Sequence, residues 1–366
     1  MTTNILSTEL DEILDQTEPL WEQLRGERIF ITGGTGFLGT WLLESFLHAN
    51  WRLNLKAHAT VLTRNPEAFK KRAAHLVTDS IVLQPGSLED FSAPPGNFAA
   101  VIHAAASVEA RASALPTMLL TSWKTLVTGT ERVLEAASRM GAKKLLLTSS
   151  GAVYGTQPPT LRLMPETYRG APDVTQASSL YGEGKRAAEM LCVFSGAASG
   201  VECKIARVFA CVGAWQPIES YFAIGNFIDD VLNGQMPRIR GDGRPYRSYL
   251  YAADAAVWLW TILFRGSANE PYNVGSEREI TIAETAKLVA HCGGLDPNSI
   301  IMPSHERNLG SSPRYVPDTS KAKTRLGLAE RVPLEEAILR TLEWHRRASG
   351  KKMRHLSPLR ARSASV

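Results

Sequence analysis

A glycine-rich turn between an apolar run and a helical stretch constrains the fold more than any other feature of the sequence. The mostly apolar residues 28–31 lead into Gly33, Gly36 and Gly39, and an apolar helical pattern follows at residues 41–47. Glycines at a strand-to-helix turn allow a tight bend and let backbone approach phosphate, while the helix N-terminus offers unpaired N–H groups. The turn therefore predicts a site for a dinucleotide pyrophosphate, although three glycines alone also occur in ordinary turns.

The composition is that of a globular protein with a substantial core. Apolar residues make up 44% of the 366, which is enough for one large domain or two modest ones. The longest strongly apolar stretch, residues 255–264, is shorter than the roughly 20 residues that cross a bilayer, and residues 1–10 lack the pattern of an export signal. We therefore expect a cytoplasmic protein without a membrane segment. The four cysteines lack paired spacing, so we expect buried thiols and neither a metal site nor a disulfide.

The net charge of +5 fits an anionic ligand and equally a solvated surface. Part of the excess lies in residues 349–366, where five Lys and Arg residues stand among serines. Such a composition is typical of a disordered tail. We expect no nucleic-acid partner.

Short apolar runs alternate with helical stretches over the first two thirds of the chain. Runs without polar alternation, separated by helices such as residues 119–140, indicate a parallel sheet covered on both faces. The fold class predicted is α/β, a doubly wound Rossmann sheet over residues 27–210, preceded by a helical arm outside it in residues 1–26. The apolar runs expected to form strands are 57–63, 80–83, 99–105, 144–149 and 204–209.

The pattern loosens after residue 210 and indicates a smaller substrate-binding lobe over residues 211–348. Its expected elements are a helix at 220–233 and mostly extended chain at 238–251, while a segment near 250–275 returns to the main sheet. A proline-rich loop at 156–177 precedes a helix that starts near Ser179. Loops of that length inside a compact domain are usually functional.

Tyr181 and Lys185 lie four residues apart, which places them on one face of the predicted helix. A neighbouring ammonium favours the phenolate form, so Tyr181 is a candidate general base and acid. Ser149 and Ser150 end a predicted buried strand, at the sheet edge where such folds bind ligands. Each feature alone has a structural explanation. Tyr181 can be a packed core residue beside a solvated Lys185, and the two serines can form a helix cap or a turn.

Together, the glycine turn, the serines and Tyr181-x-x-x-Lys185 resemble the short-chain dehydrogenase/reductase superfamily in order and spacing. Residues 151–155 (Gly-Ala-Val-Tyr-Gly) and 241–249, which contain Gly-Asp-Gly and Arg247, are more narrowly similar to its extended branch. That branch is the NAD-dependent epimerase/dehydratase family, which acts on nucleotide sugars. The resemblance covers residues 28–344 and implies a nucleotide-diphosphate sugar as substrate.

The resemblance also implies roles for individual residues. Ser150 would hold the sugar hydroxyl and share its proton with Tyr181, and Lys185 would bind the cofactor ribose and lower the pKa of Tyr181. Ser149, Asn226 and Arg247 would bind the substrate, with Arg247 on the diphosphate. The residues expected to contact the cofactor are Gly33, Thr35, Gly36, Phe37, Leu38, Gly39, Thr63, Arg64, Ser87, Leu88, Ala104, Ala105, Ala106, Tyr181 and Lys185.

The resemblance implies an enzyme that oxidises a sugar hydroxyl to a ketone and returns hydride to its other face. Dehydratases of the family carry an Asp-Glu pair after the catalytic hydroxyl, and its decarboxylases keep the glutamate, but this chain has Gly151 and Ala152 there. The hypothesis is therefore an epimerase, at C4. A dehydratase or an NADPH-dependent ketosugar reductase is the alternative, with Glu166 or Asp173 as substitute acids, and a non-catalytic NAD(P)-sensing protein is a third.

Other departures from the family pattern affect the cofactor and the substrate. Thr63 stands where an NAD site normally has Asp or Glu, and Arg64 can pair with a 2′-phosphate, which favours NADP over NAD. Ser87 replaces an aspartate near the adenine, and Ala210 replaces an asparagine that faces the substrate. The helices from residues 119 and 180 are expected to form a homodimer, as in other members.

Overall fold

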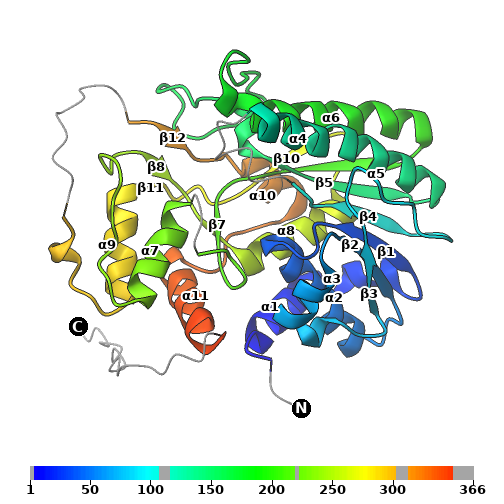
Figure 1. Cartoon of the computed structure of the whole chain (residues 1–366), viewed down its shortest axis with the longest axis horizontal. Coiled ribbons are helices and arrows are strands. Elements are labelled where there is room, and N and C mark those ends of the chain that lie inside the picture. Colours follow the sequence, from blue (N-terminus) through cyan, green and yellow to red (C-terminus); the bar gives the residue numbers. More distant parts are fainter. Residues whose placement is uncertain (1–3, 107–115, 219–221, 302–311, 349–366) are drawn as a thin grey trace.

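The computed structural model describes residues 4–106, 116–218, 222–301 and 312–348. Seven parallel strands form its main sheet, in the order β3-β2-β1-β4-β5-β6-β10 (Figure 1). This order confirms the predicted doubly wound fold. The strands are β1 (Arg28–Thr32), β2 (His58–Thr63), β3 (Ile81–Pro85), β4 (Ala100–His103), β5 (Lys144–Ser150), β6 (Glu202–Val208) and β10 (Pro271–Val274).

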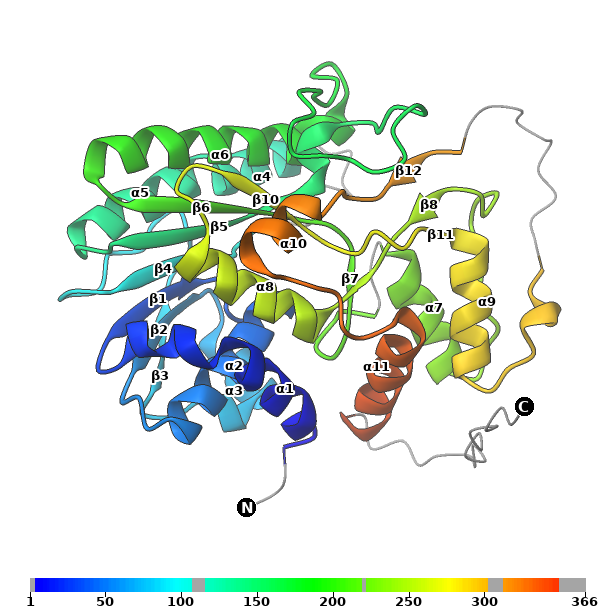
Figure 2. The same ribbon diagram turned by 180° about the vertical axis from the view of Figure 1, so that it is seen from behind.

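Helices cover both faces of this sheet (Figures 1 and 2). One layer consists of α4 (Pro116–Leu126), α5 (Thr128–Arg139) and α6 (Leu180–Ser199), and the other contains α1 (Ser7–Thr17), α2 (Phe37–Arg52) and α8 (Ala252–Arg265). The single helix predicted over residues 119–140 was wrong, because α4 and α5 are separated at Val127. The break falls in Val-Thr-Gly-Thr, residues 127–130, where helix propensity is lowest.

The N-terminal helix packs on the core and does not stand outside it, which corrects the expected arm. Leu10 and Ile13 of α1 are buried, and α1 contacts both α2 and α8. Figure 2 shows α1 beside these two helices from behind. The Tyr251 hydroxyl donates to Glu9, and Arg340 pairs with Glu12. The apolar stripe of α1 loses its contact with water only by covering α8, so it becomes part of the main domain.

The predicted return to the main sheet is observed in α8 and β10. Every residue of α8 before Arg265 is buried, so the apolar stretch at 255–264 is a core helix. β10 pairs with β6 at the sheet edge. Within the described ranges, none of the helices has the length and apolar character needed to cross a bilayer.

The remaining elements form the smaller lobe and its links to the sheet. The predicted helix at 220–233 is α7 from Ala223, and residues 220–221 and the tail at 349–366 lie outside the described residues. The domain boundaries stay a prediction. The other helices and strands are η1 (Glu18–Leu24), α3 (Pro66–Arg72), η2 (Ala74–Leu76), η4 (Gly151–Tyr154), η5 (Ala177–Ser179), β7 (Cys211–Val212), α7 (Ala223–Leu232), β8 (Tyr246–Arg247), β9 (Leu250–Tyr251), β11 (Ile280–Thr281), α9 (Ile282–Cys292), η6 (Pro297–Ser299), β12 (Arg314–Tyr315), α10 (Ser320–Leu326) and α11 (Leu334–Ala348).

Candidate active site

The glycine turn between β1 and α2 is pressed against the end of β4. Gly33 adopts φ +72°, and a Cβ there would lie 2.4 Å from the backbone N of Ala105. A Cβ at Gly39 would lie 2.0 Å from the carbonyl oxygen of Gly33. Both positions therefore require glycine, one for its backbone angle and both for space.

The N-terminus of α2 faces the same turn. Gly36 is the residue before the helix, and no side chain in the described ranges caps it. Thr35, Phe37 and Leu38 are only partly buried around this end. The backbone N–H groups of a helix start form an anion site. The glycine turn leaves a space that side chains would fill, and the N–H donors at the start of α2 face it. This arrangement fits the pyrophosphate of a dinucleotide.

The end of β5 meets the first turns of α6. The buried Lys185 ammonium donates to the carbonyl oxygen of Thr148 at 2.7 Å. Gly182 allows the approach, because a Cβ there would lie 2.6 Å from the carbonyl oxygen of Ala152. Tyr181, buried against Leu126, belongs to the same turn.

Ser150 is the residue from which η4 starts, and its hydroxyl accepts from the N–H of Ala152 at 3.1 Å. The close approach of Gly182 to Ala152 thus brings the turn that carries Tyr181 beside the turn that follows Ser150. The structure therefore places all three predicted catalytic residues around the end of β5.

A buried histidine joins this group to the strand that carries the glycine turn. The His103 ring hydrogen-bonds the Thr32 hydroxyl at 2.7 Å and the Thr130 hydroxyl at 3.0 Å. Burial, reinforced by the charge of Lys185, lowers the pKa of His103 to about 3. His103 is therefore neutral at physiological pH and connects β1 to the vicinity of Lys185.

Ser149 is engaged by protein groups. Its hydroxyl donates to Glu189 of α6 at 2.5 Å, and Glu189 in turn pairs with Arg207 of β6 at 2.6 Å. Because side chains alternate along a strand, Ser149 and Ser150 point to opposite faces of β5. Substrate binding by Ser149 stays a prediction, and the observed contact joins β5, α6 and β6.

The remaining predicted cofactor residues follow the ends of β2, β3 and β4. The Thr63 hydroxyl lies 3.5 Å from that of Thr35, and Arg64 comes next in the chain. Ser87 is bonded to Asp90 through its N–H and hydroxyl. Leu88 is buried in the core, where its side chain faces position 129. Residues 104–106 follow β4, beside Gly33.

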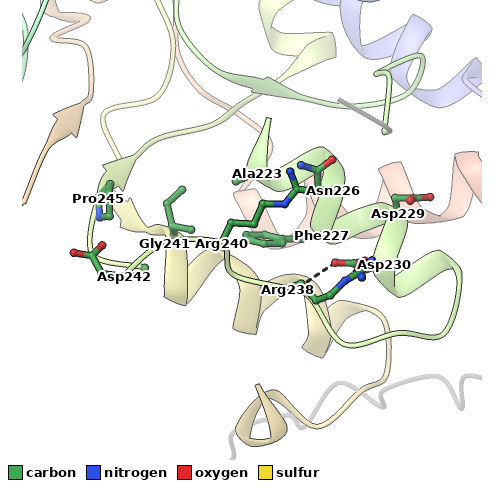
Figure 3. Close-up of a pocket in the computed structure, with 12 residues that line it drawn as sticks. Ala223, Asn226, Phe227, Asp229, Asp230, Arg238, Arg240, Gly241, Asp242 and Pro245 are labelled. Carbon is green, nitrogen blue, oxygen red and sulfur yellow. Dashed lines mark hydrogen bonds and ion pairs between the residues drawn. The ribbon is translucent and has the colours of Figure 1, made fainter. Parts of the chain in front are cut away.

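A pocket of about 780 Å³ opens in the smaller lobe, between α7 and the chain at 238–245. Asn226 lines it, and Figure 3 shows the Arg240 side chain extending toward Asn226. Arg238 is paired with Asp230 at 2.9 Å. Arg247 lies in β8, two residues past the pocket edge at Pro245, and donates to the carbonyl oxygen of Tyr246 at 2.8 Å. The pocket therefore includes Asn226, while Arg247 is not among the described residues that line it.

The position after Ser150 has no room for an acidic side chain. A Cβ at Gly151 would lie 2.7 Å from the Phe209 ring and 2.7 Å from the Tyr315 hydroxyl. Glu166 accepts the backbone N–H of Asn273 at 2.8 Å, so this carboxylate holds the 156–177 loop to β10.

The second substitute acid, Asp173, is exposed and hydrogen-bonded to Thr175. Hydrogen bonds from Thr175 lower the pKa of Asp173, so it is ionised at neutral pH. Burial raises the pKa of Glu166. A role of Glu166 or Asp173 as a substitute acid stays a prediction.

Comparison with known proteins decides the family. The model of the NAD dependent epimerase/dehydratase family matches residues 29–275, which is more than half of the chain. The chain belongs to the NAD-dependent epimerase/dehydratase family. This confirms the resemblance seen in the sequence and identifies the chain as an enzyme of that family.

Curated relatives and solved structures of the NAD-dependent epimerase/dehydratase family span most of the chain. UDP-glucuronic acid decarboxylase 2 of Arabidopsis thaliana is 30% identical over 329 residues, covering 87% of this chain and 68% of the relative. UDP-glucose 4-epimerase of Thermotoga maritima, solved with UDP-glucose, shares the fold at TM-score 0.73 and 24% identity, covering 88% of this chain and 99% of the other. MoeE5, solved with UDP-glucuronic acid and NAD, matches at TM-score 0.71 and 25% identity, and the match covers 88% of this chain and 99% of MoeE5.

Two features of this NAD-dependent epimerase/dehydratase site were not predicted from the sequence. Arg240 lines the pocket and directly precedes the Gly-Asp-Gly motif at 241–243, and this proximity was its only signal in the sequence. Glu189 lies four residues after Lys185 and eight after Tyr181, on the same helical face. That spacing was a usable signal for a residue that joins α6 to the sheet.

Proposed function

We propose that the chain is a nucleotide-sugar epimerase that acts at C4 through a transient ketosugar. The observation that carries the proposal is the end of β5, where Ser150 lies beside the α6 turns of Tyr181 and Lys185 while Gly151 is enclosed by Phe209 and Tyr315. This arrangement supplies one proton-transfer group and the cofactor turn. It has no space for an acidic side chain at position 151. At the next position, where the resembling decarboxylases keep a glutamate, Ala152 carries no carboxylate.

In the proposed mechanism Ser150 orients the sugar hydroxyl and Tyr181 removes its proton. Lys185, held by the Thr148 carbonyl, keeps positive charge beside the phenol and favours its ionised form. When bound, the nicotinamide cofactor supplies the redox chemistry by taking up hydride and returning it. Tyr181 then returns the proton to the ketosugar oxygen, which completes inversion when the sugar presents its other face.

The names of the relatives support a UDP-sugar as the substrate. The pocket of the smaller lobe would hold the nucleotide, with Asn226 on the base side and Arg240 contributing positive charge. Arg247 would reach the diphosphate from β8, since a planar guanidinium suits phosphate oxygens. The volume of about 780 Å³ lies within the range of small-molecule sites.

The test is incubation of the purified chain with UDP-glucose, UDP-galactose and the two matching UDP-uronic acids, without added cofactor. We expect one pair to interconvert into isomers of equal mass, resolved by chromatography and NMR. Loss of carbon dioxide or of water would contradict the epimerase proposal in favour of decarboxylation or dehydration. Turnover that occurs only with stoichiometric consumption of NADPH would instead establish a ketosugar reductase.

We propose NADP as the preferred cofactor. Thr63 ends β2 and leaves a hydroxyl where a carboxylate would otherwise bond the ribose, and Arg64 follows it as a cation. A carboxylate at this place selects NAD by accepting both ribose hydroxyls and repels a 2′-phosphate. Comparison of the affinities of the chain for NADP⁺ and NAD⁺ tests this choice, and tighter binding of NAD⁺ would contradict it.

We propose a homodimer formed through α4 and α6. These helices lie side by side (Figure 1) and carry exposed large apolar side chains. Leu120 is 63% exposed, and Met190 and Phe194, one turn apart on α6, are 60% and 66% exposed. Such a patch on paired helices supports a twofold contact between copies of the chain, as the family resemblance implies.

The double variant Met190→Glu/Phe194→Glu is expected to be monomeric, because each copy would place two carboxylates in the contact. Light scattering coupled to gel filtration measures the mass. Trp51→Glu, which changes a 70% exposed apolar residue on α2, is the matched control and should leave the dimer intact. An unchanged mass of the double variant would place the contact elsewhere.

A further inference from the structure

Arg72, the last residue of α3, reaches the glycine turn. Its guanidinium donates to the carbonyl oxygen of Thr35, between Gly34 and Gly36. It also lies over the Trp215 ring, 5.7 Å from the centroid. Arg72 thus links α3, the turn and the chain after β7 at the place where Thr35 and Thr63 hydroxyls lie 3.5 Å apart.

The charge of Arg72 is not balanced by a carboxylate in the described part of the chain. The Arg72 guanidinium contacts the carbonyl oxygen of Thr35 and the rings of Phe69 and Trp215, and burial against them lowers the pKa of Arg72. Glu44 is already engaged by His75 at 2.8 Å and Asn4 at 3.0 Å. The Arg72 side chain nevertheless stays accessible to solvent, so a ligand can reach it.

The Trp215 ring, which lies against the Arg72 guanidinium, is fixed by its neighbours. Trp215 adopts φ +68°, a conformation that is costly for a residue other than glycine. Its ring packs on Trp344 of α11 at 4.7 Å, and the preceding carbonyl, of Ala214, accepts from Trp41 at 2.8 Å. Trp215 has a strained backbone and a fixed ring beside the Arg72 charge, and such strain is typical of ligand-binding sites.

We propose that Arg72, with the hydroxyls of Thr35 and Thr63, binds the 2′-phosphate of NADP. The inference rests on the proposed dinucleotide function and deepens it by naming the residue that selects the cofactor. A guanidinium supplies two parallel donors to phosphate, and the threonine hydroxyls add neutral donors without repelling it. Arg64, at the end of β2, is then a second cation at the rim.

The experiment measures the affinities of the wild type and of Arg72→Met for NADP⁺ and NAD⁺ by titration calorimetry. The wild type is expected to bind NADP⁺ at least about tenfold more tightly than NAD⁺. Arg72→Met should weaken NADP⁺ at least about tenfold and NAD⁺ less than about twofold, and Arg72→Lys should keep part of the difference. Lys71→Met is the matched control, since it removes an equal charge one residue away and should leave both affinities unchanged.

Three outcomes overturn the inference. An unchanged NADP⁺ affinity removes Arg72 from the site, and equal losses for both dinucleotides assign it to the shared pyrophosphate or to the turn. Equal or tighter NAD⁺ binding by the wild type overturns the cofactor preference too, whereas binding of neither overturns the proposed function. If Arg72→Met does not fold, the wild type alone decides: adenosine 2′,5′-bisphosphate should bind at least about tenfold more tightly than 5′-AMP.

Discussion

Tyr181→Phe is expected to lower kcat for the sugar reaction by about 10²–10⁴-fold, the usual contribution of a positioned general acid and base. The substitution removes one oxygen from a buried ring that packs on Leu126, so the packing is retained. Dinucleotide affinity should change little, because the glycine turn and Lys185 are untouched. Steady-state kinetics and calorimetry on the same preparation measure the two quantities.

The matched control is Tyr272→Phe. Tyr272 is also buried, and its hydroxyl bonds Ser267, which lies before β10 and away from the end of β5. Its loss should leave kcat within about threefold, since the hydroxyl takes no part in proton transfer. Wild-type turnover by Tyr181→Phe would refute the assigned role, and equal losses in both variants would point to a stability effect.

The main sheet was predictable because each of its strands carries a local signal. Residues 57–63 and 144–149 are continuous apolar runs bounded by turns, and β2 and β5 lie there. The glycine turn predicted the order of β1 and α2. Where the pattern was ambiguous the prediction failed, as for residues 119–140, because local propensity at 127–130 ended the helix within an otherwise helical pattern.

Tertiary contacts account for what the sequence did not reveal. The position of α1 depends on the apolar surface that α8 offers, and α8 lies about 240 residues later in the chain. The contact of Arg72 with Thr35 spans 37 residues and involves a loop near Trp215 that no local pattern identifies. The spacing of the motifs predicted which residues gather around Ser150. That Arg72 lies at the glycine turn could be seen only from the fold.

The Glu189–Arg207 pair explains how α6, the helix that carries Tyr181 and Lys185, is held to the sheet, and the contact can be tested. Glu189 accepts from Ser149 and Arg207, so α6 is joined to β5 and β6 one turn beyond Lys185. Burial opposes the charge of Arg207, but its hydrogen bonds to Glu189 outweigh this and raise the pKa of Arg207. The Arg207 guanidinium also lies over the Tyr154 ring, 4.7 Å from its centroid.

Arg207→Met is expected to lower the free energy of unfolding by about 3–5 kcal/mol, because it leaves the buried Glu189 carboxylate without its cation. The double variant Glu189→Met/Arg207→Met should recover most of this loss, since apolar replacements of a buried pair are often nearly neutral. Urea unfolding followed by circular dichroism measures both. The control is Arg139→Met, which breaks an exposed pair with Glu135 at 3.6 Å and should cost at most about 1 kcal/mol. A loss in the double variant as large as in Arg207→Met would mean that packing, and not an unpaired charge, dominates at this contact.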